Sequence, residues 1–256
     1  MPKLRDILLP SFRDFHQKTA HRPMIQVAYD SDLCQEVMAN GWLSEAQTPH
    51  AAERYRLGKS KSGKTIYWMM DEMMQVRDGH LGDAWVSQLL KAREPELMQW
   101  FQVKHCLFGL HLLLCPAERA ERAEIIKSQT DATFITSQRE DLSAFSAISA
   151  GQNICVVESE RSAVILSELF PESLWMAYVY PVNMTPHLFE PLQGRSITIY
   201  PRTDPEMDIY VSFLEFAENV RRLYPSIRLT VDTLLEDNAT ADQKRRHIDL
   251  LDFIIE

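Results

Sequence analysis

The strongest constraint on the fold is the regular alternation of strand and helix patterns after Gly151. NICVVE is a fully apolar strand, SERSAVILSELF a helix opened by a capping Ser, and SLWMAYVYP a second apolar strand. A third strand in SITIYP, a helix over MDIYVSFLEFAENVRRLY and a last strand over SIRLTVDTLL complete the series. This alternation predicts a mostly parallel sheet with right-handed crossovers and flanking helices, an α/β domain over residues 153–256.

The preceding residues show three further patterns. Residues 1–53 are predicted to be a helical N-terminal segment, with a helix in DSDLCQEVMANGWL. Residues 54–115 form a β-rich (α+β) region, because RYRLG, KTIYWMMDE and QVRDGHLG are short β-favouring segments typical of a small antiparallel sheet. Residues 116–152 are expected to be a helical or flexible insertion, opened by Pro116 and AERAERAEIIKS.

Composition limits the classes of partner. The chain has 256 residues with 45% hydrophobic side chains, enough to fill a core, so global disorder is excluded. Lys and Arg number 27 against 36 Asp and Glu, a net charge of −9, so any nucleic-acid binding must use a local patch. No apolar run approaches the roughly 20 residues of a membrane helix. We therefore expect a soluble, cytoplasmic protein with no membrane partner.

Four cysteines occur without any CxxC pair, which predicts buried free thiols and no zinc site: Cys34, Cys106, Cys115 and Cys155. His105 and His111 lie in the apolar segment HCLFGLHLLLC. We interpret both histidines as core residues satisfied by hydrogen bonds, because metal ligation would need several deprotonated ligands to converge within a packed apolar segment.

GKSKSGKT, residues 58–65, satisfies the P-loop pattern. HAAERYRL is too polar for the buried strand that such a loop requires, and TIYWMMDEMM begins with β-formers. A basic hairpin turn is therefore the preferred interpretation, with a nucleotide-binding P-loop as the alternative. Basic side chains in and beside the turn are candidates for binding a nucleic-acid backbone, with a simple solvated turn as the other interpretation: Arg54, Arg56, Lys59, Lys61 and Lys64.

Acidic residues follow two of the strands predicted in the α/β domain. Glu158 ends NICVVE, and Asp204, Glu206 and Asp208 follow SITIYP. Because ligands of parallel sheets bind beyond the carboxyl ends of the strands, these carboxylates could meet and hold Mg²⁺. The alternatives are a Glu158 that favours a helix N-terminus, and an acidic loop in which Asp208 caps the next helix.

Several of these segments carry a family resemblance. CVVESERSAVILSELFP, ITIYPRTD and HIDLLDFIIE look like the Toprim-like half of an uncharacterised family of primase-like proteins carried by bacterial mobile elements. RYRLGKSKSGKTIYWMMDEMMQVRDGHLG and HCLFGLHLL resemble the β-rich region that precedes that half. The resemblance implies a Toprim-like fold, with the order of the two regions preserved.

The resemblance also implies roles for individual residues. Glu158 matches the general acid or base, and Asp204 matches the second Asp of an Asp-x-Asp motif that binds Mg²⁺ for phosphoryl transfer. Arg202 stands at the first Asp, and a guanidinium cannot ligate Mg²⁺, so only weak Mg²⁺ binding is expected. The Gly after the second strand and the N-terminal zinc ribbon of that family are absent. Arg161, one turn into the next helix, is expected beside Glu158 and Asp204 and is a candidate nucleic-acid contact.

Three functions remain open at this point. The first is a nucleic-acid-associated, primase-like protein with a degenerate Toprim-like domain, which binds single-stranded DNA, another nucleic acid or a nucleotide during mobile-element replication or transfer. The second is an active Mg²⁺-dependent primase or nuclease in which Glu206 or Asp208 replaces the missing ligand. The third is a non-catalytic module that binds a protein partner through an exposed methionine face of Met69, Met70, Met73 and Met74, with a buried sheet core as the more common alternative for such a cluster.

Overall fold

The computed structural model describes residues 26–72, 74, 76–93, 105–113, 152–179 and 185–256. The chain forms two compact units, and each contains one four-stranded sheet. The first unit comprises Met1–Glu36, Ala52–Cys106 and Leu110–Ala150, and the second comprises Val37–Ala51, Leu107–Gly109 and Gly151–Glu256. The predictions for residues 1–25 and for most of the insertion at 116–152 lie outside the described residues.

The sheet of the second unit is parallel, as the alternating pattern predicted. Its strands are β5 (Ile154–Val157), β6 (Leu174–Ala177), β7 (Ser196–Ile199) and β8 (Arg228–Val231), in the order β6-β5-β7-β8. Every residue of β5 and β6 is buried, whereas β7 and β8 bury every second residue. The mixed α/β class is therefore confirmed for this part of the chain.

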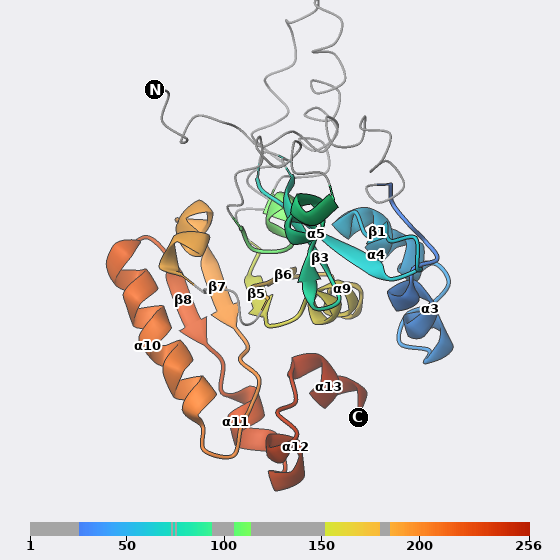
Figure 1. Cartoon of the computed structure of the whole chain (residues 1–256). Helices are drawn as coiled ribbons and strands as arrows, with labels where there is room; N and C mark the ends of the chain where they lie inside the picture. Colours follow the sequence, from blue (N-terminus) through green and yellow to red (C-terminus); the bar gives the residue numbers. More distant parts are fainter. Residues whose placement is uncertain (1–25, 73, 75, 94–104, 114–151, 180–184) are drawn as a thin grey trace, which may run out of the picture. The chain divides into compact units, whose positions relative to one another are not determined.

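Two helices make the crossovers of this sheet (Figure 1). Helix α9 (Glu160–Leu169) joins β5 to β6, and the predicted capping residue is confirmed because the Ser159 side chain accepts the N–H of Ser162. Helix α10 (Asp208–Leu223) joins β7 to β8 and packs along β8. The short 3-10 helix η3 (Pro186–Leu192) precedes β7.

Each edge strand of the parallel sheet makes a hydrogen-bonded contact with another segment. At β6, Phe108 and Ala177 exchange two backbone hydrogen bonds, of 2.8 and 3.1 Å. At β8, Arg221 Nη1 donates to the Leu229 carbonyl at 2.9 Å. These contacts occupy edge groups that would otherwise be available to pair with another strand.

The chain ends in three short helices, α11 (Leu234–Asn238), α12 (Ala241–Arg245) and α13 (Leu250–Ile255). The prediction that the last strand runs through SIRLTVDTLL is wrong beyond Val231. The side chain of Asp232 accepts the N–H of Leu234 at 2.8 Å, which turns the chain out of the sheet and into α11.

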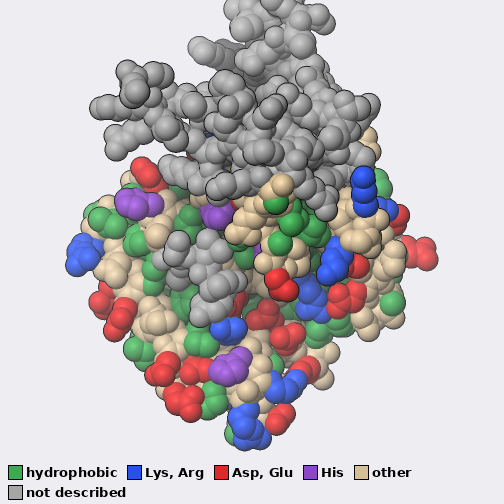
Figure 2. Space-filling view, in the orientation of Figure 1, with side chains coloured by type: hydrophobic (Ala, Val, Ile, Leu, Met, Phe, Trp, Pro, Cys, Tyr) green, Lys and Arg blue, Asp and Glu red, His purple; other side chains and the backbone are tan. Residues whose placement is uncertain are grey.

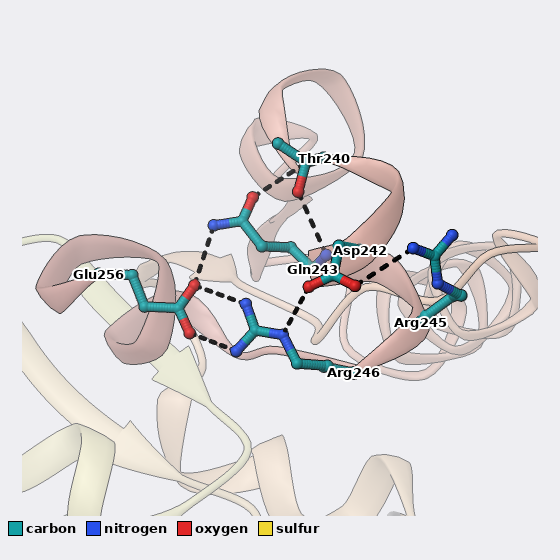
Figure 3. A network of polar contacts seen from close by, with 6 residues as sticks. All are labelled: Thr240, Asp242, Gln243, Arg245, Arg246 and Glu256. Carbon is teal, nitrogen blue, oxygen red and sulfur yellow. Dashed lines mark hydrogen bonds and ion pairs between the residues drawn. The ribbon is translucent and has the colours of Figure 1, made fainter.

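A network of polar contacts joins the residues of α12 and its C-cap to Glu256, which follows α13 (Figure 3). Arg246 donates to both carboxylate oxygens of Glu256, at 2.5 and 2.8 Å, and Gln243 donates to the same carboxylate. Thr240 and Gln243 form a capping box at the start of α12. The Arg246 guanidinium lowers the pKa of Glu256 to about 2.

The sheet of the first unit is antiparallel. Its strands are β1 (Gly58–Lys59), β2 (Thr65–Met70), β3 (Val76–Leu81) and β4 (Ala84–Trp85), in the order β1-β2-β3-β4. Helices α3 (Asp32–Ala39) and α4 (Gln47–Tyr55) precede it, and α5 (Val86–Arg93) and η2 (Leu110–Leu113) follow it. The predicted small antiparallel sheet is confirmed.

The prediction of a strand over RYRLG is wrong, because Arg54 and Tyr55 belong to α4. Ala51, Ala52 and Tyr55 are buried on this helix, so helical burial of its apolar face overrides the local β preference of Tyr55. Only Gly58 and Lys59 enter the sheet.

The described methionines of the cluster next to Trp68 belong to the core. Met69, Met70 and Met74 are all buried, so the proposed exposed methionine face is wrong for these three side chains. Met73 lies outside the described residues. Packing is tight here, since a Cβ on Gly79 would lie 2.8 Å from the Trp68 ring.

Cys34 and Cys155 are buried free thiols, as predicted, while Cys106 is a partly buried free thiol and Cys115 lies outside the described residues. Among the helices that the structure describes, we find none that combines the length and the apolar character needed to cross a bilayer.

Candidate functional site

The ends of β5 and β7 define the candidate site. These strands are parallel neighbours, but the chain leaves β5 toward β6 and leaves β7 toward β8, on opposite sides. The carboxyl ends of β5 and β7 therefore flank a topological switch point, the usual ligand position in open α/β sheets. Glu158 directly follows β5, and Arg202 follows β7 by three residues.

Glu158 is fixed in a buried position. Its exposed fraction is 8%, and its backbone carbonyl accepts the N–H of Val179 at 3.0 Å. Val179 has φ 50°, a left-handed conformation that is strained for a β-branched residue. Burial raises the pKa of the Glu158 carboxyl to about 7, against the opposing effect of Arg202 and with a further contribution from Asp249. The carboxyl group can therefore gain and lose a proton near neutral pH.

Arg202 provides the positive charge at the switch point. Its Nε lies 3.4 Å from Glu158 Oε2, and its side chain is 31% exposed. This separation exceeds the 2.7–2.9 Å typical of a charge-assisted hydrogen bond. Glu158 Oε2 is buried and accepts no hydrogen bond from any residue that the structure describes. The pair is thus loose. Arg202 Nε is buried, while the side chain as a whole is partly exposed.

Both carboxylate oxygens of Asp204 already accept backbone hydrogen bonds, which competes with metal binding. Its Oδ2 accepts the N–H of Asp208 and its Oδ1 accepts the N–H of Ile209, both at 3.1 Å. The carboxylate therefore caps the first turn of α10. The alternative in which Asp208 caps this helix is wrong, because Asp208 supplies one of the capped N–H groups.

The residues at this position do not fit Mg²⁺. Arg202 contacts Glu158 where a ligand would be needed, Asp204 already binds two N–H groups, and Glu206 and Asp208 are exposed. Within the described ranges there is also no cluster of three or more His, Cys, Asp or Glu side chains placed to hold a metal ion.

The C-terminal helices hold the Arg202–Asp204 loop, which the sequence analysis did not anticipate. The Thr203 hydroxyl donates to Glu236 at 2.7 Å, and Lys244 donates to the other Glu236 oxygen at 2.7 Å. The Thr203 N–H donates to the Ile248 carbonyl at 3.1 Å. A partly buried ion pair and a backbone hydrogen bond therefore hold the loop that carries Arg202 beside Glu158.

A second C-terminal contact reaches the start of α9. The Ser162 hydroxyl donates to the carboxylate of Asp249, the N-cap residue of α13, and Ser159 and Ser162 lie 2.7 Å apart at their hydroxyl oxygens. The charge of Asp249 therefore adds to the raised pKa of Glu158. Its carboxylate also accepts the N–H of Asp252 at 3.0 Å.

Arg161 lies in the first turn of α9. Its guanidinium stacks over the Trp42 ring at 4.8 Å from the centroid, a cation–π contact. Burial raises the pKa of the Asp252 carboxyl group, and the charge of Arg161 opposes part of this shift. Arg161 thus has structural partners in its own unit, and its proposed role in nucleic-acid binding stays a prediction.

The predicted basic hairpin exists in the first unit. Gly58 pairs with Ile66 and Lys59 with Thr65, and no helix follows the turn, so GKSKSGKT does not form a P-loop. Two of the five candidate basic residues form ion pairs with acids. Lys59 pairs with Asp30 at 2.5 Å, and Arg56 contacts Glu53 at 3.9 Å. Lys61 and Lys64 are exposed.

Basic and acidic side chains are interspersed on the face drawn in Figure 2, where no broad basic patch forms on the described residues. The two histidines of HCLFGLHLLLC have hydrogen-bond partners, as predicted. His111 Nε2 lies 3.1 Å from the Arg54 carbonyl, and His105 Nε2 lies 3.0 Å from the buried carboxylate of Asp78.

Comparison of the chain with curated proteins and with solved structures finds no match. Residues 33–143 and 144–203 match one protein family, and these two segments together cover more than half of the chain. The protein therefore belongs to the family described as Domain of unknown function (DUF6371).

Proposed function

We propose that the second unit is a Toprim-like module that binds nucleic acid or a nucleotide at the switch point of its sheet, without metal-dependent catalysis. The observation that carries this proposal is the placement of Arg202 beside Glu158 at the ends of β5 and β7. A guanidinium at a strand-end crevice suits a phosphate group better than a divalent cation.

Two further observations support binding rather than catalysis. Both Asp204 oxygens are bound to backbone N–H groups of α10, and the exposed acids Glu206 and Asp208 carry no described contact to Glu158. The resemblance to primase-like proteins of mobile elements makes single-stranded DNA the first ligand to test, in replication or transfer of such an element.

The test is fluorescence anisotropy of a labelled single-stranded oligonucleotide across a salt series. We expect affinity that falls steeply with salt, because phosphate contacts release counterions. Arg202→Ala should weaken binding, whereas Arg228→Ala should not, since Arg228 is an exposed arginine at the opposite, amino end of the same sheet. Absence of binding at low salt, or equal effects of the two variants, would refute the proposal.

Phosphoryl transfer is the second candidate, and one observation favours it. The pKa of Glu158 is raised to about 7, which suits a general acid or base near neutral pH. Extension or cleavage of a single-stranded template that is lost in Glu158→Gln but retained in Glu218→Gln, a change at an exposed acid of α10, would support it. No turnover by the wild-type chain, together with salt-dependent binding, would leave binding as the function.

A further inference from the structure

The chemistry of the Glu158–Arg202 pair identifies which phosphate group the crevice prefers. This inference rests on the proposed binding function and adds the class of ligand. We propose that the switch-point crevice binds a phosphate monoester, with Arg202 contacting its anionic oxygens and Glu158 sharing a proton with one of them.

Arg202 is the group that attracts the anion. Its side chain is partly exposed, and its loop is held by Thr203 against Glu236, so the guanidinium approaches the crevice from a fixed direction. Its Nε lies 3.4 Å from one Glu158 carboxylate oxygen, which is longer than a charge-assisted hydrogen bond. A phosphate offers several acceptor oxygens and could form shorter, bidentate contacts with the same guanidinium.

The carboxyl group of Glu158 determines which anions can bind beside Arg202. Its Oε2 is buried beside Arg202 and has no donor among the residues that the structure describes. An anion bound to Arg202 would lie against this carboxyl group, so a proton must be shared between the two acids to avoid repulsion between like charges. Asp249, the other acid that acts on Glu158, does not supply that proton, because its carboxylate accepts the Ser162 hydroxyl.

A phosphate monoester meets this requirement best. Its second pKa is about 6, so it still carries a proton in part of the population near neutral pH and accepts a proton readily as a dianion. A phosphodiester carries no such proton and has one negative charge less to offer Arg202. The terminal phosphate of a DNA strand and a free nucleoside monophosphate share this chemistry, whereas the internal backbone of DNA lacks it.

The experiment compares two oligonucleotides of the same sequence, labelled at the 3′ end, that carry either a 5′-phosphate or a 5′-hydroxyl. We expect about tenfold tighter anisotropy binding of the 5′-phosphorylated strand, the size of one strong charge-assisted contact. The preference should disappear in Arg202→Ala and persist in Arg228→Ala. Competition with a nucleoside 5′-monophosphate and with inorganic phosphate then separates a free nucleotide from a strand end as the source.

Glu158→Gln provides a second variant that keeps the side-chain size. Its amide donates a hydrogen bond at every pH, so the 5′-phosphate preference should no longer fall as pH rises from about 6 to 8, and only the ionisation of the phosphate itself remains. In the wild-type protein the preference should fall as pH rises over that range. Equal affinity for the two strands in the wild-type protein would overturn the monoester inference while leaving salt-dependent DNA binding intact, and no binding of either strand would overturn both.

Discussion

Arg202 Nε lies 3.4 Å from Glu158 Oε2, across the carboxyl ends of two neighbouring parallel strands. The carboxyl group is buried, yet its cationic partner is too distant and too exposed to compensate fully for the loss of solvent. The raised pKa of Glu158 follows from this imbalance, since burial is the largest influence on it. Protonation of Glu158 is therefore coupled to the stability of the fold.

The first prediction concerns the pH dependence of stability. The pKa of Glu158 is about 7 in the folded protein and has an ordinary value of 4.5, so the folded state holds the proton more tightly. The contribution of Glu158 to stability is therefore complete below about pH 4.5, declines as pH rises to about 7 and stays low above it. Urea unfolding at several pH values should show this decline in the wild-type protein.

In Glu158→Gln this decline should be absent, which makes the variant the more stable protein at pH 8. The pKa difference of about 2.5 corresponds to a gain of at most about 3 kcal/mol. Glu206→Gln serves as the control, because Glu206 is an exposed acid in the loop after the neighbouring strand. Parallel pH profiles for wild type and Glu158→Gln would contradict the assignment of the raised pKa to this residue.

The second prediction separates a helix cap from a metal ligand at Asp204. Asp204→Ala removes the acceptor of two N–H groups of α10 and should lower the free energy of unfolding by about 1–2 kcal/mol. Asp204→Asn keeps a capping oxygen and should stay within about 1 kcal/mol of wild type. Thermal unfolding of the two variants checks this, and equal destabilisation by both would show that the negative charge matters more than the cap.

The parallel sheet was predictable from its two fully buried strands, which are apolar runs that are stable only in a sheet covered on both faces. Ile154–Val157 and Leu174–Ala177 are buried at every position, and no helix pattern competes with them. Tyr55 illustrates the opposite case, since its β preference is local while its burial on α4 depends on the whole helix. In short segments whose local preferences conflict, tertiary packing determines the secondary structure.

The candidate site was predictable only in part. The strand pattern in the sequence indicated a parallel sheet, but it did not indicate the strand order that brings Glu158 and Arg202 together. The supporting contacts were not predictable, because Glu236 reaches Thr203 across 33 residues and Asp249 reaches Ser162 across 87. Nothing in the local sequence of α11 or α13 marks these two acids among the many others of an acidic chain.

The third prediction tests the contact that holds the Arg202 loop. Glu236→Ala leaves Lys244 without its ion pair and Thr203 without its acceptor, and should cost about 2–4 kcal/mol, since one partner of a largely buried pair is removed. It should also weaken the 5′-phosphate preference. Asp237→Ala, an exposed acid of the same helix, should have a much smaller effect on both measurements. Equal loss of stability in the two variants would argue against this positioning role.

The last prediction concerns the first unit, where Asp78 is buried at the centre of a polar cluster. Its carboxylate accepts the N–H groups of Gly79 and Ser87 at 2.7 and 2.9 Å and the Ser87 hydroxyl at 2.6 Å, and it pairs with His105, whose ring stacks on Trp85. Asp78→Ala would leave several buried donors without an acceptor, so we expect a loss of about 3–5 kcal/mol.

Asp83→Ala is the matched control, because Asp83 is an exposed acid in the turn that follows the same strand. Ser87→Ala, which removes only the hydroxyl donor to Asp78, should cost about 1 kcal/mol and so fall between the two. Denaturant unfolding followed by tryptophan fluorescence would report the change, since Trp68 and Trp85 lie in this sheet. If Asp78→Ala were no more destabilising than Asp83→Ala, the cluster could not be what joins β3 to the start of α5.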